Sequence, residues 1–434
     1  MRKYILIYAY TSLFRDELKY WNDLSVALYK KGFHLVLLSP QSPGGYHHFI
    51  NELFIERLDW VKINGSIDSE ITIDYSKYLE RENIWYGSSN YDRLSAAKIQ
   101  REKYVKILDE LNPCFVLVSN GQHASEIILI DEIKKRNTPH GFFERGCLTK
   151  SWHYDDIGIT AGTTIANKGI NQIELPSNTF LYDSFKKNYL NKKETWWSQP
   201  SINSALNIRD KYSIDVNTKL ILFVNQLDND TSNFLYSPFF QGNIDAFRWF
   251  LNTMKGVDCF VIAKKHPMYD SDDENFKTAF KELGVNGVWV DNISLFDCLE
   301  QSDFVCTVNS TVIYEALIYE KPVLQMGQSI ISNKDIVYEL KSLEELRVID
   351  DWLNSEKLKQ RLVLFKRFMS YMIDKELSFF SYKTKGSNDF SLFLSIILER
   401  LDSKRKGQKT ISFGTKKNFK FSIKRYLILL KFLK

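Results

Sequence analysis

Short hydrophobic runs alternate with longer amphipathic segments along most of this chain, and the alternation predicts strands joined by helices. In the first half, strands are predicted at 4–10, 33–40, 114–121 and 139–146. Helices are predicted between them at 14–32, 91–111 and 123–137. Because parallel strands need a crossover of about this length, the order of elements predicts a parallel sheet.

A second block of the same kind follows the polar stretch near 190–218. Its strands are predicted at 219–226, 259–267, 287–291, 303–310 and 321–327, and its helices at 244–256, 274–284, 295–301 and 311–320. Two such blocks predict an α/β fold of two doubly wound domains. The segment 350–400 is predicted to be mostly helical and to close the second domain or pack back on the first.

Composition agrees with two domains of ordinary globular character. The chain has 434 residues, of which 44% are hydrophobic, and it has no run of 18 apolar residues that would predict a transmembrane helix. Its first residues predict a buried strand and not a signal peptide. The five cysteines form no CxxC pair, which argues for a reducing compartment and against a structural zinc. The cytoplasm is therefore the expected location.

The end of the chain differs in charge from the rest. From Lys404 onward there are eleven Lys and Arg residues and no acid, whereas the remainder is mildly acidic. Within 419–434, apolar residues recur at helical spacing and lysines lie on another face. This pattern predicts a peripheral helix on an anionic membrane surface, with a packing helix or a frayed end as the alternative. No fold motif accompanies the charge that would indicate nucleic-acid binding.

Ligands of open α/β sheets bind at the carboxyl ends of the strands, so polar residues directly after predicted strands are the candidate site residues. Lys264 and His266, in the sequence KKHP, end the strand at 259–267. A cation and an imidazole at this edge suit a phosphate or a sugar carboxylate. A charged turn without function explains the same residues.

The next such place is the sequence VNSTVIYEAL. The strand at 303–310 ends at Asn309, and Ser310 or Thr311 is a favourable cap for the following helix. The helix start can bind an anion through its free N–H groups, and Glu315 could then face a ribose hydroxyl. An ordinary cap and a solvent-exposed glutamate are the alternative, although KKHP earlier in the same block favours a binding site.

Two further places carry acids. Glu144 follows an apolar pair in FFERG, where a carboxylate can act as a general acid or base or simply pair with Arg145. In ILFVNQLDNDTS, a strand-like run stops at Asp228, Asn229 and Asp230. An acid-x-acid triplet can hold a divalent cation or form a plain turn. Because KKHP and NST already offer phosphate-binding groups, we expect no metal here. Neither GxGxxG nor a P-loop motif is present.

Together these motifs resemble a known family. In order and spacing, QLDNDTS, KKHP and NSTVIYEAL followed by KPV resemble the capsule-polysaccharide synthesis and O-antigen Kdo transferases. The resemblance covers 140–327, with Glu144 in E-R-G matching an E-x-G element. It implies GT-B architecture, with two Rossmann-like domains facing a cleft, and retaining β-Kdo transfer from CMP-Kdo to a lipid-linked glycan.

The resemblance also implies residue roles. Asp230 would attack the anomeric carbon and form a covalent Kdo adduct, with Asp228 as a competitor for this role. Glu144 would deprotonate the acceptor hydroxyl. The donor would be bound by Gln226, Lys264, His266, Asn309, Ser310, Thr311 and Glu315. These donors would stabilise the leaving CMP without a metal, and no cofactor besides the donor substrate is implied.

The sequence departs from the family pattern at four positions. Asn229 stands where a second acid is frequent, Arg145 where an acid is common, and Ile313 and Glu320 replace usual glycines. Two other functions remain open. One is a GT-B transferase of another nucleotide sugar, such as CMP-sialic acid or a UDP-sugar. The other is a catalytically silent GT-B module at the membrane.

The resulting domain prediction has four segments. They are an acceptor domain at 1–205, a nucleotide-sugar domain at 206–345, C-terminal helices at 346–403 and the basic membrane-associating tail at 404–434. With a lipid-linked acceptor, the expected location is the cytoplasmic face of the inner membrane.

Overall fold

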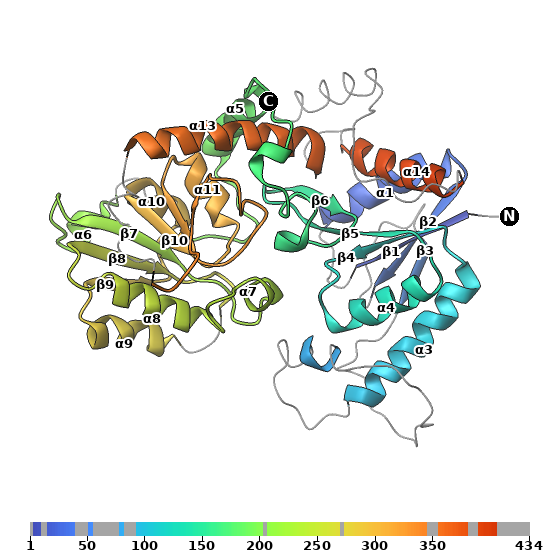
Figure 1. Ribbon diagram of the computed structural model, residues 1–434, viewed down its shortest axis with the longest axis horizontal. Coiled ribbons are helices and arrows are strands. Elements are labelled where there is room, and N and C mark those ends of the chain that lie inside the picture. Colours follow the sequence, from blue (N-terminus) through green and yellow to red (C-terminus); the bar gives the residue numbers. More distant parts are fainter. Residues whose placement is uncertain are drawn as a thin grey trace. The chain divides into compact units, whose positions relative to one another are not determined.

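A computed structural model of the chain consists of two compact units, each built around its own α/β sheet (Figure 1). It describes residues 3–9, 15–39, 51–54, 78–81, 93–202, 206–269, 273–344, 355–380 and 389–405. Unit 1 comprises Met1–Gly146, Lys150–Ile159 and Met372–Lys434, and unit 2 comprises Cys147–Thr149 and Thr160–Tyr371. The predicted fold class, two Rossmann-like α/β domains, is confirmed.

The sheet of unit 1 is parallel except at one end. Its strands are β1 (Lys3–Tyr8), β2 (Phe33–Ser39), β3 (Asn51–Phe54), β4 (Phe115–Ser119), β5 (His140–Arg145), β6 (Ser151–Asp155) and β13 (Leu377–Phe379). They are ordered β13-β6-β5-β4-β1-β2-β3. Strand β6 runs antiparallel to both β5 and β13, whereas the other pairs are parallel.

Helices cover both faces of this sheet (Figure 1). They are α1 (Arg15–Tyr29), α3 (Arg93–Leu111), α4 (Ala124–Lys135) and α14 (Ser391–Arg405). Apolar residues of β1, β2 and β4 pack against α3 and α4. On the other face, the Trp21 ring of α1 contacts Phe143 of β5 at 4.8 Å and Phe393 of α14 at 5.6 Å between centroids. Burial on both faces explains why the strands read as continuous hydrophobic runs.

Every pair of neighbouring strands in the sheet of unit 2 is parallel. Its strands are β7 (Lys219–Val224), β8 (Cys259–Lys264), β9 (Gly287–Val290), β10 (Phe304–Thr307), β11 (Val323–Gln325) and β12 (Tyr338–Glu339). They are ordered β12-β11-β10-β7-β8-β9. The helices are α5 (Phe180–Lys192), α6 (Ile208–Lys211), α7 (Thr231–Leu235), α8 (Asn243–Thr253), α9 (Glu274–Leu283), α10 (Leu295–Gln301), α11 (Val312–Ile318) and α13 (Ser355–Tyr371).

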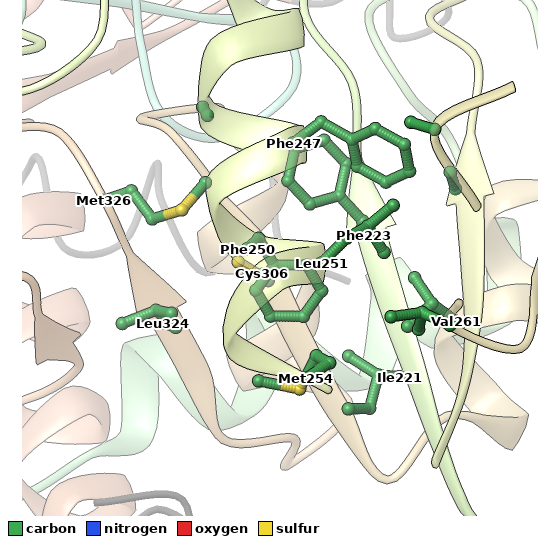
Figure 2. Close-up of a cluster of buried hydrophobic side chains, with 14 of the residues drawn as sticks. Ile221, Phe223, Phe247, Phe250, Leu251, Met254, Val261, Cys306, Leu324 and Met326 are labelled. Carbon is green, nitrogen blue, oxygen red and sulfur yellow. The ribbon is translucent and has the colours of Figure 1, made fainter. Parts of the chain in front are cut away.

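The core of unit 2 is rich in aromatic rings. Figure 2 shows Phe247 and Phe250 of α8 facing Phe223 of β7. The Phe247 ring lies 4.8 Å from that of Phe223 and 5.3 Å from that of Phe280 on α9, in edge-to-face contacts. These side chains are buried, so they fix α8 and α9 on one face of the sheet while α10 and α11 cover the other (Figure 1).

The division between the units differs from the predicted boundary after residue 205. The described residues from 160 to 202 belong to unit 2, because α5 lies against α13, where the Tyr182 and Phe365 rings are 5.5 Å apart. The buried Lys334 Nζ also donates hydrogen bonds to the carbonyls of Ala166 and Lys168, at 3.4 and 2.9 Å. Contacts with residues distant in sequence therefore set this boundary.

The C-terminal segment is divided between the units. Helix α13 belongs to unit 2, whereas β13 and α14 belong to unit 1. The sequence predicted mostly helix here and missed β13, a three-residue strand that follows a π-helical turn at Met372–Glu376. The short strand is stabilised by antiparallel pairing with β6, which no local pattern reveals.

In the described part of the chain, no helix has the length and apolar character needed to cross a membrane. The predicted basic tail at 404–434 lies outside the described residues apart from Lys404 and Arg405, the last two residues of α14. Its membrane association therefore stays a prediction.

We expect Phe247→Ala to lower the free energy of unfolding by about 3–5 kcal/mol, because it leaves a cavity among packed rings. Phe180→Ala is the matched control. Phe180 is 47% exposed at the start of α5, and its truncation should cost less than about 1 kcal/mol. Urea denaturation followed by tryptophan fluorescence measures both. Equal losses in the two variants would contradict the core described here.

Candidate active site

The predicted site residues of unit 2 lie where its sheet changes direction. From β7 the chain builds β8 and β9 on one side, and it later builds β10, β11 and β12 on the other. The carboxyl ends of β7 and β10 are thus neighbours at the topological switch point, where open α/β sheets bind ligands. Gln226 follows β7 and Asn309 follows β10, so the fold brings these two residues together.

The side chains of Gln226 and Asn309 form a buried amide pair. Gln226 Nε2 donates to Asn309 Oδ1, and the Asn309 backbone N–H donates to Gln226 Oε1, both at 2.9 Å. The Thr307 hydroxyl adds a third hydrogen bond, at 3.2 Å, to Gln226 Oε1. The turns after β7 and β10 are therefore fixed to each other before any ligand binds.

Asp228 lies in the turn after β7 and is solvent-exposed. Its Oδ1 accepts hydrogen bonds from the backbone N–H and the side-chain amide of Asn243, at 3.1 and 2.9 Å. Asn243 is the first residue of α8, so Asp228 satisfies an N–H group at the start of that helix. The Tyr269 hydroxyl is 3.4 Å from the other carboxylate oxygen.

Asp230 is the N-cap of α7. Its Oδ1 accepts a hydrogen bond of 2.8 Å from the backbone N–H of Ser232. Burial raises the pKa of Asp230, while the hydrogen bond from Ser232 acts in the opposite direction. The two acids that compete for the role of nucleophile therefore also have structural roles as caps of different helices.

The acidic turn at 228–230 is held by asparagines that the sequence did not predict as site residues. Asn233 Nδ2 donates to the carbonyl of Leu227 at 2.8 Å, and Asn243 Nδ2 donates to that of Gln226 at 3.0 Å. A third, Asn225, directly follows β7 and is fully buried, and its carboxamide has no hydrogen-bond partner among the described residues. Buried amides are normally paired. Asn225 directly follows β7, whereas Asn233 lies within α7 and Asn243 begins α8, so no shared sequence signal marks these residues.

Lys264 and His266 lie at the same edge, after β8. The Lys264 Nζ is buried and donates to the carbonyls of Lys265 and Asp291, at 3.3 and 3.2 Å, so it joins the ends of β8 and β9. Burial lowers the pKa of Lys264. His266 is half-buried, and burial followed by the charge of Lys264 lowers its pKa to about 4.

The imidazole of His266 is therefore neutral at pH 7. Its Nδ1 accepts a hydrogen bond of 3.1 Å from the backbone N–H of Met268, which leaves the proton on Nε2. A neutral Nε2–H group can donate to a phosphate or carboxylate oxygen without carrying a charge. The lysine thus has a structural role at this edge, while the histidine presents a donor.

After β10, the Ser310 hydroxyl accepts a hydrogen bond of 3.2 Å from the backbone N–H of Val312, and Thr311 is exposed as the N-cap of α11. Glu315 follows on this helix. Burial raises the pKa of Glu315 to about 7, and the Tyr189 hydroxyl acts in the opposite direction. Tyr189 comes from α5, which the predicted boundary had assigned to the first domain, so the sequence could not indicate this neighbour.

Two departures from the family pattern have a structural explanation. Glu320, where a glycine is usual, adopts φ 59°, a left-handed conformation that glycine accepts without strain. Its carboxylate pairs with Lys186 of α5 at 2.6 Å. Ile313 is fully buried in the core, where an apolar side chain is favourable.

Glu144 belongs to unit 1, near the carboxyl end of β5. Its Oε2 accepts a hydrogen bond of 3.0 Å from Asn120 Nδ2, and its Oε1 accepts one of 2.8 Å from the backbone N–H of Arg145. The Arg145 guanidinium binds Glu17 of α1, with 3.0 Å between Nε and Oε1.

Over the residues that the structure describes, no three His, Cys, Asp or Glu side chains are grouped as ligands of a metal ion. The predicted donor-binding residues of unit 2 converge on one sheet edge, and Glu144 lies at the corresponding edge of the other sheet.

Comparison with solved structures returns matches of low sequence identity. The β-Kdo 2,7 transferase of KpsC from Thermosulfurimonas dismutans matches 69% of this chain and 90% of its own, with 14% identity and a TM-score of 0.43. The β-Kdo 2,4 transferase of the same protein matches 59% and 79%, with 15% identity and a TM-score of 0.41. S. aureus MnaA with UDP matches 95% and 100%, with 13% identity and a TM-score of 0.40.

No curated protein matches the chain in sequence. Residues 186–377, however, match a family model described as "Capsule polysaccharide biosynthesis protein". The matched segment begins within α5 and contains the strands of the unit 2 sheet and the site residues from Tyr189 to Glu315. Over residues 186–377, which are fewer than half of its residues, the chain is thus similar to the capsule polysaccharide biosynthesis protein family.

Proposed function

We propose that the protein is a retaining glycosyltransferase of capsule or O-antigen/lipopolysaccharide synthesis, which transfers Kdo from CMP-Kdo to a lipid-linked glycan. The observation on which this rests most is the switch point of unit 2. There the paired Gln226 and Asn309 hold an acidic turn beside the donor group of His266. The match of residues 186–377 to a family model described as "Capsule polysaccharide biosynthesis protein" supports the reaction class. The choice of Kdo rests on the motifs QLDNDTS, KKHP and NSTVIYEAL.

In the proposed reaction, a carboxylate oxygen of Asp230 attacks the anomeric carbon of the donor. The bond from that carbon to the CMP phosphate breaks, and CMP leaves with the electron pair. The acceptor hydroxyl then displaces Asp230 from the same carbon, while Glu144 takes the hydroxyl proton. Two displacements restore the original configuration. Asp228 is the alternative nucleophile.

The donor-binding groups would act mainly on the leaving nucleotide. The Nε2–H of His266 and the groups around Ser310 and Thr311 would stabilise the phosphate, and Glu315 would accept hydrogen bonds from the ribose. The buried Lys264 would contribute through its charge. We propose that the reaction needs no metal ion, so transfer should persist in excess EDTA. The acceptor and the contact of the tail with the membrane are further parts of the proposal.

The nucleophile can be identified by paired variants. Incubation of the wild type with CMP-Kdo and a glycolipid extract should release CMP, and intact mass should reveal a Kdo adduct. We expect Asp230→Asn to lower CMP release by roughly a thousandfold or more and to abolish the adduct, since the amide is not a nucleophile. Asp228→Asn keeps the acceptor for Asn243 and should retain most activity.

Full activity of Asp230→Asn together with an inactive Asp228→Asn would show that Asp228, and not Asp230, is the nucleophile. Release of nucleotide from CMP-sialic acid or a UDP-sugar, but not from CMP-Kdo, would mean that the protein is a glycosyltransferase with a different donor sugar. No turnover of any nucleotide sugar would contradict the proposed enzyme and leave a silent binding module.

Glu315 should make donor binding depend on pH. With a pKa of about 7, its carboxyl loses its proton as the pH rises from 6 to 8, and the carboxylate is the stronger acceptor for ribose hydroxyls. The KM for CMP-Kdo should therefore fall over this range. Glu315→Gln should remove the pH dependence, and a KM profile equal to that of the wild type would contradict the ribose role.

The same raised pKa has a consequence for stability. Because the folded-state value lies above the ordinary value of 4.5, the protonated form favours folding at low pH. This contribution is present below about pH 4.5 and is lost as the pH rises through about 7. Without donor, Glu315→Gln should flatten this part of the dependence of the unfolding free energy on pH.

A further inference from the structure

Unit 1 holds a polar network around Glu144 that the proposed reaction does not yet explain. Strand β4 is followed by Asn120 and Gly121, both in left-handed conformations with φ 66° and 81°. A side chain at Gly121 would collide with Phe142, since a Cβ atom there would lie 2.5 Å from the ring. Position 121 therefore requires a glycine, both because of its left-handed backbone and because Phe142 leaves no space for a side chain.

The turn directs the Asn120 side chain at β5. The Asn120 backbone N–H donates to the carbonyl of Phe143 at 2.9 Å, which extends the pairing of β4 with β5 by one residue. Its Nδ2 then reaches Glu144 Oε2 at 3.0 Å. Its Oδ1 accepts the backbone N–H of Gln122 at 3.1 Å, so the carboxamide orientation is fixed with Nδ2 toward the carboxylate.

A second carboxyl group lies close by. Glu126, in the first turn of α4, is fully buried, and its Oε2 accepts the backbone N–H groups of Gln122 and His123 at 3.0 and 3.1 Å. Burial, and the nearby charge of Glu144 to a lesser degree, raise the pKa of Glu126 well above its ordinary value. Burial therefore disfavours a second negative charge on Glu126 beside Glu144.

The remaining charged groups around Glu144 come from other elements. His153 of β6 lies directly across from it in the sheet, and the His153 ring is 3.6 Å from Glu376. Arg145 is turned to the opposite face, where it pairs with Glu17. The Glu144 carboxylate accepts hydrogen bonds from the Asn120 side chain and from the Arg145 backbone N–H.

We infer that Asn120 is a positioning residue that holds Glu144 ionised and oriented to take a proton from the acceptor hydroxyl. The inference rests on the proposed function, in which Glu144 is the base. A donor to a carboxylate favours the ionised form, and a second carboxylate in its place favours the protonated form. Asn120→Asp is the sharpest test, because aspartate has the same shape, keeps the acceptor for Gln122 and tolerates the left-handed backbone.

We expect Glu144 to take up its proton about one pH unit or more higher in Asn120→Asp than in the wild type. The titration is followed by ¹³C NMR of the full-length protein, labelled with glutamate enriched in ¹³C at the carboxyl carbon. The Glu144→Gln variant identifies the resonance of Glu144. The acidic limb of the pH–rate profile for CMP-Kdo and a glycolipid extract should shift by the same amount. At a pH on that limb, kcat should fall by about tenfold and recover at high pH, with little change in the KM for CMP-Kdo.

Asn112→Asp is the matched control. Asn112 is an exposed asparagine with φ 41° at the other end of β4, and its substitution should change neither titration nor profile. Unchanged titration of Glu144 in Asn120→Asp would overturn the inference, whether or not the enzyme is active. A shifted titration in a protein that turns over no nucleotide sugar would support the control of Glu144 by Asn120 and refute the proposed transfer. An active enzyme whose Asn120→Asp profile matches that of the wild type would refute only the positioning role.

Discussion

The pairing of β7 with β10 is the constraint on which the candidate donor site depends. It makes the carboxyl ends of two strands neighbours although 83 residues separate Gln226 from Asn309. Hydrogen bonds in both directions between these residues then fix the two turns as one body. Leaving either buried amide unpaired would cost on the order of 1–3 kcal/mol, so the geometry is set before a ligand arrives.

The acids of the turn show how structural and chemical roles can coincide. Asp228 and Asp230 cap α8 and α7, and each cap fixes one carboxylate oxygen. A fixed carboxylate has lost the freedom of rotation that an attack on a sugar would otherwise have to restrict. Capping therefore does not argue against a nucleophile in this turn. It explains why a plain turn and a catalytic turn share the same sequence pattern.

Left-handed backbone conformations place polar side chains in both units. The left-handed pair Asn120 and Gly121 directs a carboxamide at Glu144. Glu320 adopts a left-handed conformation with φ 59°, at a strain of roughly 1–2 kcal/mol for a residue that is not glycine. Its ion pair with Lys186 connects the turn after α11 to α5.

The sequence by itself determined the α/β class, most strands and helices, and the convergence of Gln226, His266 and Asn309. Those features follow from hydrophobic periodicity and from the rule that parallel strands share a carboxyl edge. Only the tertiary structure decided the boundary at residue 160, the strand β13, the proximity of Tyr189 to Glu315 and the hydrogen bond between Asn120 and Glu144. Each of these depends on contacts between residues far apart in the chain or on a left-handed turn, and neither leaves a periodic pattern in the sequence.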